Sequence, residues 1–255
     1  MGLLDGKNAL VFGVANQRSI AYGIASALRR EGASLGLSYV GPAIQKRVEP
    51  IATELGNAFT FQCDVSDDES IGESVNTVLK HWDRVDIIIH SVAFAPKEAL
   101  CGRYIDTPRS GFLTAMDISV FSLPALCKAY ESLLHAGSSI VAMTYYGAQK
   151  AVKNYNVMGV AKAALESSVR YLALDLGGKG IRVNAISSGP VRTLASSAIS
   201  GFVAMQDYIV ERSPLHKNVT TTDVGNTAVF LASEWSSSVT GEILFVDCGY
   251  NIVGM

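Results

Sequence analysis

The sequence predicts one α/β domain, organised as a doubly wound parallel sheet of about seven strands with helices on both faces. Short apolar runs alternate with amphipathic segments from one end of the chain to the other. Most of these runs are too continuous to leave one face in water, as expected for strands covered on both sides. Neither a Pro- or Ser-rich linker nor an internal repeat divides the 255 residues. Repeated strand–helix alternation favours right-handed βαβ units in a single sheet.

The expected elements follow one another in a regular order. Strands are predicted at 8–14, 34–40, 58–65, 85–92, 139–145, 181–187 and 243–248. Helices are predicted at 20–32, 71–82, 111–134, 159–177 and 223–234, and Gly177 and Gly178 end the fourth of them. This order is typical of a Rossmann-like domain, which we expect to span residues 1–255.

The segment 188–222, between the sixth and seventh strands, interrupts this order. It is rich in Ser and Gly, with scattered apolar residues. A long insertion beyond the carboxyl end of a strand often covers a bound substrate. We therefore expect a substrate lid at about 194–213.

Composition narrows the classes of function. Charged residues make up 17% of the chain, below the roughly 25% of average domains, and the net charge of −2 argues against nucleic-acid binding. Hydrophobic residues make up 49%. A chain this apolar and weakly charged is typical of subunits that bury surface against one another, so we expect an oligomer.

Cysteine and histidine positions indicate a reduced, metal-free protein. The cysteines form no Cys-x-x-Cys pair and lie in apolar runs, which favours packed thiols in a cytoplasmic protein. They are Cys63, Cys101, Cys127 and Cys248. The four histidines show no metal-ligand spacing. The first residues lack the basic region and cleavage site of a signal peptide, and no membrane span is expected.

The loop after the first strand has the chemistry of a phosphate site. Gly13 permits a sharp turn, and Ser19 can cap a helix that begins near Ile20. The free N–H groups of such a helix attract an anion. The alternative is an ordinary strand–helix loop capped by Ser19.

The ends of the second and third strands bear on an adenosine ligand. An acidic residue after the second strand often holds a ribose, and a basic one accommodates a 2′-phosphate. Val40 is neither, and Lys46 and Arg47 are expected on the following helix, which favours NADH over NADPH. Asp64 is placed to contact adenine. Its alternative role is to cap the next helix, which Asp67 could do instead.

The stretch NYNVMGVAKA, at 154–163, pairs Tyr155 with Lys162. If the stretch is helical, seven residues are nearly two turns, and both side chains lie on one face. A phenol and an ammonium so arranged can stabilise a negative oxygen. The alternative is a helix that carries both residues by chance.

Taken together, these segments resemble the short-chain dehydrogenase/reductase superfamily, and within it the enoyl-[acyl-carrier-protein] reductases. The resemblance runs the whole length of the chain. The motifs are SIAYGIA (19–25), QCDV (62–65), HSVAFAP (90–96), NYNVMGVAKAALE (154–166) and RVNAISSGPVRTLA (182–195). It implies NADH-dependent reduction of the C2–C3 double bond of trans-2-enoyl thioesters in fatty-acid elongation. It also implies NAD(H) as cofactor, acyl carrier protein as partner, and a homotetramer.

Spacing separates this branch from the carbonyl reductases, which typically carry Tyr-x-x-x-Lys. That spacing would require a lysine at 159, where the chain has Gly159. An enoyl thioester receives hydride two carbons away from its carbonyl carbon, so the phenol must stand further from the hydride donor.

The resemblance also implies the site residues. Tyr145, Tyr155 and Lys162 are the catalytic set, with Tyr146 as the competitor of Tyr145. Cofactor contacts are implied for Gly13, Ser19, Ile20, Asp64, Val65, Ser91, Val92, Lys162, Val191, Thr193, Leu194 and Ala195. Substrate contacts are implied for Ala95, Tyr145, Tyr155, Met158, Ile199, Phe202 and Met205. His90 is expected to be buried and hydrogen-bonded rather than catalytic.

Three departures from the family pattern stand out. The basic residues often found on the lid helix are replaced by Ser200, Val203 and Ala204, which puts carrier-protein docking by that patch in doubt. Ala93 stands where many relatives have Gly, and Cys248 replaces a Gly of the usual VDGG.

The chain also suggests where subunits would meet. The helix after Tyr155 carries apolar residues on more than one side, including Val169 and Leu172, and the C-terminal segment is apolar. One helix face must cover the sheet, and another could face a neighbouring subunit. The alternative is that both surfaces belong to the core of one subunit.

Two further functions remain open at this stage. One is a short-chain reductase for another activated alkene or a carbonyl, against which Gly159 argues. The other is a non-catalytic NAD(H)-binding scaffold, against which the joint presence of Tyr145, Tyr155 and Lys162 argues.

Overall fold

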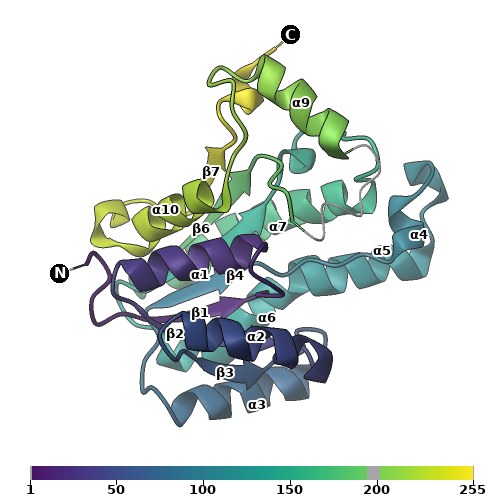
Figure 1. The fold of residues 1–255 in the computed structure, drawn as a ribbon. Coiled ribbons are helices and arrows are strands. Elements are labelled where there is room, and N and C mark those ends of the chain that lie inside the picture. The colour runs from purple at the N-terminus through teal and green to yellow at the C-terminus, as the bar shows by residue number, and fades with distance from the viewer. Residues whose placement is uncertain (1, 194–201, 255) are drawn as a thin grey trace.

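Seven parallel strands form one sheet, as expected from the sequence, and their order is β3-β2-β1-β4-β5-β6-β7 (Figure 1). The computed structural model describes residues 2–193 and 202–254. The strands are β1 (Asn8–Phe12), β2 (Ser34–Tyr39), β3 (Phe59–Gln62), β4 (Ile87–His90), β5 (Ser139–Thr144), β6 (Arg182–Ser188) and β7 (Ile243–Val246). The strand order reverses between β1 and β4. In an open parallel sheet, ligands bind at such a reversal, outside the carboxyl ends of the strands.

Helices cover both faces of the sheet. One face carries α1 (Ile20–Arg30), α2 (Pro42–Glu54) and α10 (Thr221–Ala232), and the other carries α3 (Asp68–Leu79), α6 (Ser122–Tyr130) and α7 (Val157–Gly177). Figure 1 shows α9 (Phe202–Arg212) and α4 (Lys97–Leu100) projecting away from the sheet. Lys46 and Arg47 lie on α2, as expected, and both are exposed.

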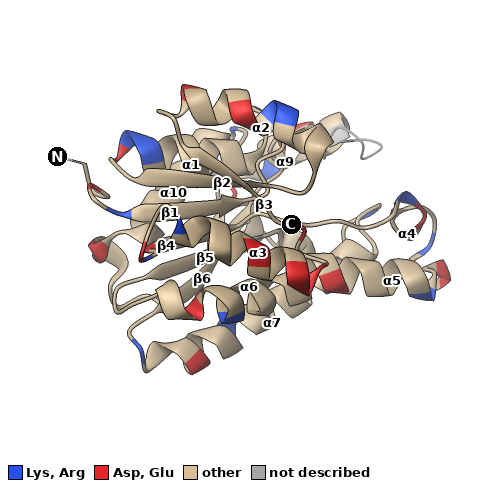
Figure 2. Cartoon of the chain, turned by 90° about the horizontal axis from the view of Figure 1, so that it is seen from below, with Lys and Arg blue, Asp and Glu red and all other residues tan. Residues whose placement is uncertain are grey.

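Each face of the sheet has its own hydrophobic core. Strand residues alternate between the two cores: Ile87 and Ile89 enter the first, and Ile88 enters the second. The strands are therefore apolar on both sides, which explains their continuous hydrophobic runs. Figure 2 shows the charged residues mainly on the outer sides of helices and in loops.

The helix expected at 111–134 is composed of successive segments. It comprises α5 (Arg109–Met116), a π-helical turn (Asp117–Phe121) and α6. By length and composition alone, Arg109–Leu133 could cross a membrane. Core helices share that composition, and Leu123, Leu126 and Tyr130 are buried in the core between α3 and α7.

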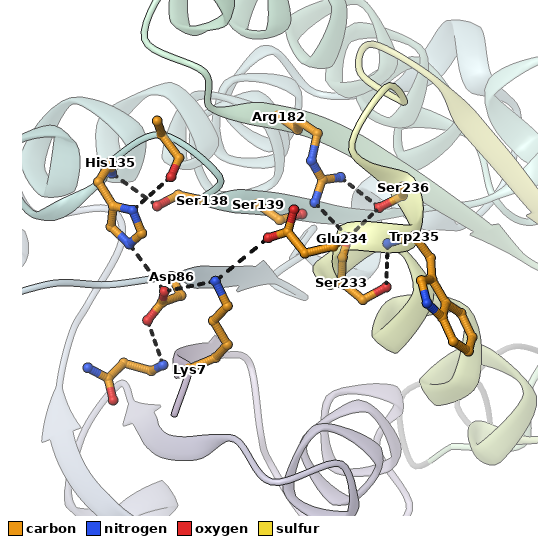
Figure 3. A network of polar contacts seen from close by, with 12 residues as sticks. Lys7, Asp86, His135, Ser138, Ser139, Arg182, Ser233, Glu234, Trp235 and Ser236 are labelled. Atoms are coloured by element: carbon orange, nitrogen blue, oxygen red, sulfur yellow. Dashed lines mark hydrogen bonds and ion pairs between the residues drawn. The ribbon is translucent and has the colours of Figure 1, made fainter. Parts of the chain in front are cut away.

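A polar network closes the amino-terminal edge of the sheet (Figure 3). Asp86 is 2% exposed; it accepts a hydrogen bond from Asn8 N at 2.8 Å and lies 3.4 Å from Lys7 Nζ and 3.2 Å from His135 Nε2. Arg182 donates to a carbonyl at the end of α10 at 2.8 Å. The buried carboxylate of Asp86 thus has a cationic partner, and the buried guanidinium of Arg182 is hydrogen-bonded to neutral acceptors.

The expectation of four packed cysteines is wrong for one of them. Cys63 and Cys127 are buried, and Cys248 is partly so, but Cys101 is exposed just after α4. Its apolar neighbours belong to a small satellite cluster that leaves the thiol outside.

Candidate active site

The turn after β1 leaves no room for a side chain. Gly13 has φ +103°, and a Cβ there would collide with the Ser91 carbonyl after β4. Ser19 caps α1 by accepting from Tyr22 N at 3.2 Å, as expected, and the first turn of α1 carries no acidic residue. No carboxylate of that turn therefore competes with an anion for the N–H groups at the start of α1, from Ile20 onward.

The end of β3 separates the two roles considered for Asp64. Asp67 caps α3, accepting from Glu69 N at 3.1 Å. Asp64 accepts from Ser66 Oγ at 2.6 Å and is half-buried, and Val65 beside it is buried. Asp64 is therefore not needed as the helix cap.

Two buried side chains, His90 and Ser119, fix the segment that follows β4. His90 is fully buried, its Nε2 lies 2.7 Å from Ser122 Oγ, and burial lowers its pKa to about 3. The imidazole is therefore neutral. These contacts agree with the expectation that His90 is buried and hydrogen-bonded. Ser119 both accepts from Phe94 N and donates to Phe94 O at 3.0 Å. This fixes the path of the chain past Ser91, Val92 and Ala95.

Tyr145 and Tyr155 lie together at the carboxyl end of β5. Their ring centroids are 5.0 Å apart, with the planes at 73°. Tyr146 instead packs on Tyr250, at 5.7 Å. Burial raises the pKa of Tyr145 to about 12 and raises that of Tyr155 as well, so both are hydroxyl donors at neutral pH.

Lys162 is buried on α7, with 5% of its surface exposed. Its ammonium donates to the Met143 carbonyl of β5 at 2.7 Å. Burial lowers the pKa of Lys162 to about 8, while Glu166 acts in the opposite direction. A buried cation therefore lies at the strand end that carries the two tyrosines.

The expectation that one helix carries both Tyr155 and Lys162 is wrong. α7 begins at Val157, and Tyr155 lies in the preceding turn, where Asn154 and Asn156 have φ of +65° and +38°. Asn tolerates a positive φ more readily than most residues, which allows the turn. The phenol is thus placed by the turn and not by helical periodicity.

Two glycines allow close packing around Tyr155, one beside its ring and one beneath the loop after β5. A Cβ at Gly147 would lie 2.6 Å from Tyr155 Cδ1, and one at Gly159 would lie 2.8 Å from the Gly147 carbonyl oxygen. These residues and Tyr155 also line a cavity of about 410 Å³. Gly159 is therefore required by close packing of α7 against the loop after β5.

The lid prediction is only partly within the described residues. Leu194, Ala195 and Ile199 lie outside them. Phe202 begins α9, and on the same helix Met205 Sδ lies 3.9 Å from Tyr145 Oη.

The chain that leads into the lid passes close to the same strand ends. Gln206 of α9 donates to the Pro190 carbonyl at 3.0 Å. Val191 is buried, and Thr193 is partly exposed. Met158 is buried, with its sulfur 3.8 Å from Ser119 Oγ.

Sequence reasoning missed several supporting residues, namely Thr144, Ser119, Ser122, Glu166 and Gln206. One signal was readable: Glu166 follows Lys162 by four residues, on an apolar stretch of helix where a charge is unusual. The serines gave no signal, because hydroxyls occur often in such helices.

The fold and site together define a class of protein, the short-chain reductases that place a Tyr and a Lys at the carboxyl end of a strand in a doubly wound sheet. The chain matches the family described as Enoyl-(Acyl carrier protein) reductase over residues 13–251. It belongs to this family.

Individual members of the family are similar to this chain in sequence and structure over nearly their whole length. The chain is 52% identical to an enoyl-[acyl-carrier-protein] reductase [NADH] of Aquifex aeolicus, covering 100% of this chain and 95% of the relative. The crystal structure of that species' enzyme gives a TM-score of 0.97, with 100% of both chains covered. A Bacillus cereus enoyl-acyl carrier protein reductase, solved with NADP+ and indole naphthyridinone, gives 0.98 at 46% identity, again with 100% of both chains covered.

Proposed function

We propose that this protein uses NADH to reduce the C2–C3 double bond of trans-2-enoyl thioesters carried by acyl carrier protein, in fatty-acid elongation. The observation that supports this most is the Tyr145–Tyr155 pair beside buried Lys162, in a chain 52% identical to an NADH-dependent enoyl reductase. It is an oxidoreductase acting on a carbon–carbon double bond.

Tyr155 acts on the charge that develops during the reaction. When bound, NADH would supply the hydride that C3 of the substrate receives; negative charge would then appear on the thioester oxygen, and a proton added at C2 would complete the reduction. The Tyr155 hydroxyl, which keeps its proton because burial raises its pKa, donates a hydrogen bond to that oxygen. A preorganised donor of this kind contributes about 3 kcal/mol. Tyr145 lines the thioester pocket and contributes less.

The described residues fit NAD(H). Gly13 lets the chain turn tightly, and the α1 N-terminus capped by Ser19 receives the pyrophosphate. The Lys162 ammonium has three N–H donors and gives one to the Met143 carbonyl. The other two would bind the nicotinamide ribose hydroxyls. The remaining proposed contacts come from Ile20, Asp64, Val65, Ser91, Val92, Val191 and Thr193.

The end of β2 supports a preference for NADH. Val40 is 52% exposed and offers neither a carboxylate nor a base, while Lys46 and Arg47 point outward on α2. A 2′-phosphate would gain no ion pair from Val40. Relatives named as NADH enzymes agree with this choice.

The acyl chain lies between α7 and the proposed lid at about 194–213. Met158, Met205 and Ala95 supply the described apolar surface around the two tyrosines, and we include Ile199 and Phe202 in that wall. The whole chain, 1–255, then forms one NAD(H)-binding domain with its substrate cover.

We also propose a cytoplasmic homotetramer. Of the apolar residues that the sequence singled out on the helix after Tyr155, Val169 is fully buried in the core and Leu172 is partly buried against it. The exposed apolar face of α7 is formed instead by Val160, Tyr171 and Leu174, with Leu174 78% exposed. An apolar face of this kind marks a contact between subunits.

One assay tests the proposal against its rivals. Purified protein is mixed with NADH and either a crotonyl thioester or a ketone, and NADH oxidation is followed by absorbance. We expect oxidation with the thioester and none with the ketone. Oxidation with the ketone alone would assign the protein to the carbonyl reductases, and NADH binding without turnover would make it a scaffold.

A further inference from the structure

A buried polar layer lies between the sheet and the first half of α7. On the sheet face that packs against α7, His90 ends β4, Thr144 ends β5 and Ser187 is the last residue but one of β6, each in line with the apolar residues that precede it. All three are 4% exposed or less. Two of the buried atoms, His90 Nδ1 and Ser187 Oγ, have no hydrogen-bond partner within the part of the chain that the structure describes.

Two residues of α7, one helical turn apart, join this layer to β5. Lys162 Nζ donates to the Met143 carbonyl at 2.7 Å, and Thr144 Oγ1 donates to Glu166 Oε1 at 2.8 Å. Lys162 and Glu166 are each 5% exposed. Consecutive residues of β5 are thus bound to consecutive turns of α7, directly before Tyr145.

The charges in this layer act on one another. Burial raises the pKa of Glu166, and the Thr144 hydroxyl, Arg170 and Lys162 oppose that rise. Burial lowers the pKa of Lys162 to about 8, and Glu166 opposes that fall. His90 faces Lys162 from β4 and is neutral, since burial lowers its pKa to about 3. The phenols of Tyr145 and Tyr155 are protonated.

We propose that Glu166, held by Thr144 one helical turn from Lys162, is a positioning residue that stabilises the Lys162 ammonium for the nicotinamide ribose and fixes the strand end from which Tyr145 extends. This role deepens the proposed function and rests on it. Neither residue touches the reacting atoms, so both act through Lys162 and Tyr145.

Two variants separate the charge from the hydrogen bond. Glu166→Gln keeps an oxygen that accepts from Thr144 but removes the charge, whereas Thr144→Val removes the donor and keeps the carboxylate. Asp175→Asn is the matched control, because it removes an exposed carboxylate from the same helix.

The readouts are NADH affinity by fluorescence from about pH 6 to about pH 10, kcat, melting temperature, and carbon-13 NMR titration of the lysine side chains without cofactor. For Glu166→Gln we expect the Lys162 midpoint, and with it the loss of NADH affinity, to move down by about one pH unit. For Thr144→Val we expect a lower kcat and a smaller shift of the Lys162 midpoint. For Asp175→Asn we expect no change in either.

An unchanged Lys162 midpoint in Glu166→Gln overturns the inference, even if the melting temperature falls, because a merely structural acid would lower stability alone. The NMR titration keeps this outcome separate from the enzymatic proposal. A wild-type protein inactive on crotonyl thioester would remove the proposed function, while the Lys162 midpoint would still report on Glu166.

Discussion

Tyr155 keeps its proton across the physiological range, because burial raises the pKa of its hydroxyl. Tyr155→Phe removes the donor and retains the ring between Gly147 and Tyr145. We expect kcat on enoyl thioesters to fall by about 100-fold, as for loss of one oxyanion donor, with NADH affinity nearly unchanged. Stopped-flow turnover and fluorescence titration of NADH measure the two effects.

Lys162→Ala is the companion variant to Tyr155→Phe. It removes the cation that we assign to the ribose, so NADH affinity should fall together with kcat. If Tyr155→Phe were fully active, the role assigned to the phenol would be wrong.

Cys248 occupies a backbone conformation suited to glycine, with φ +59°. A side chain in the left-handed region costs about 1 kcal/mol, and Gly adopts it freely. Cys248→Gly should therefore raise the free energy of unfolding by up to about 1 kcal/mol, measured by urea denaturation. Cys101→Gly, where φ is −95°, serves as the control and should give no gain. Equal effects of the two substitutions would contradict the backbone argument.

At the scale of elements, the segment from β5 to α7 shows what the sequence could and could not predict. Strand β5 and the helix were readable from apolar runs, while the roles of Tyr155 and Lys162 were implied by the family resemblance and stay a prediction. The geometry was not predicted, because Asn154 and Asn156 form a turn where helical spacing was assumed. Asn is a common turn residue, so the two Asn residues that flank Tyr155 were a local turn signal that the assumption of a helix overlooked.

Gly147 tests whether the turn positions Tyr155. Gly147→Ala would place a methyl 2.6 Å from the phenol ring and displace it. We expect kcat to fall about 10- to 100-fold, since small misplacements of catalytic groups are costly, with NADH affinity unchanged. Gly72→Ala, on α3 with nothing within 4 Å of its Cβ, is the control and should retain full activity. A fully active Gly147→Ala protein would show that the ring has room to move.

For the whole molecule, the sheet was predictable because strands buried on both faces leave continuous apolar runs. The solvent exposure of single residues was less predictable. Helix α7 is apolar almost all round, and its sequence does not say which side meets the sheet. The structure assigns Val169 to the core and Leu174 to the surface.

Assembly can be tested on that surface. Leu174→Glu places a charge on the exposed face of α7 and should dissociate a tetramer, because burying an unpaired charge is costly. Analytical ultracentrifugation should give about four times the 27.1 kDa chain mass for the wild type and less for the variant. Leu79→Glu is the matched control, because Leu79 lies on α3 and is 51% exposed. This variant should remain tetrameric. A wild-type mass of one chain would remove the proposal.

The contact between Gly159 and the Gly147 carbonyl has an evolutionary consequence. A carbonyl reductase with Tyr-x-x-x-Lys would need a lysine at 159, where even one added carbon would lie 2.8 Å from a backbone oxygen. No single substitution converts one arrangement into the other, because the loop after β5 would have to change its path first. Backbone packing in this chain therefore opposes a change from one spacing to the other, whatever chemistry would favour it.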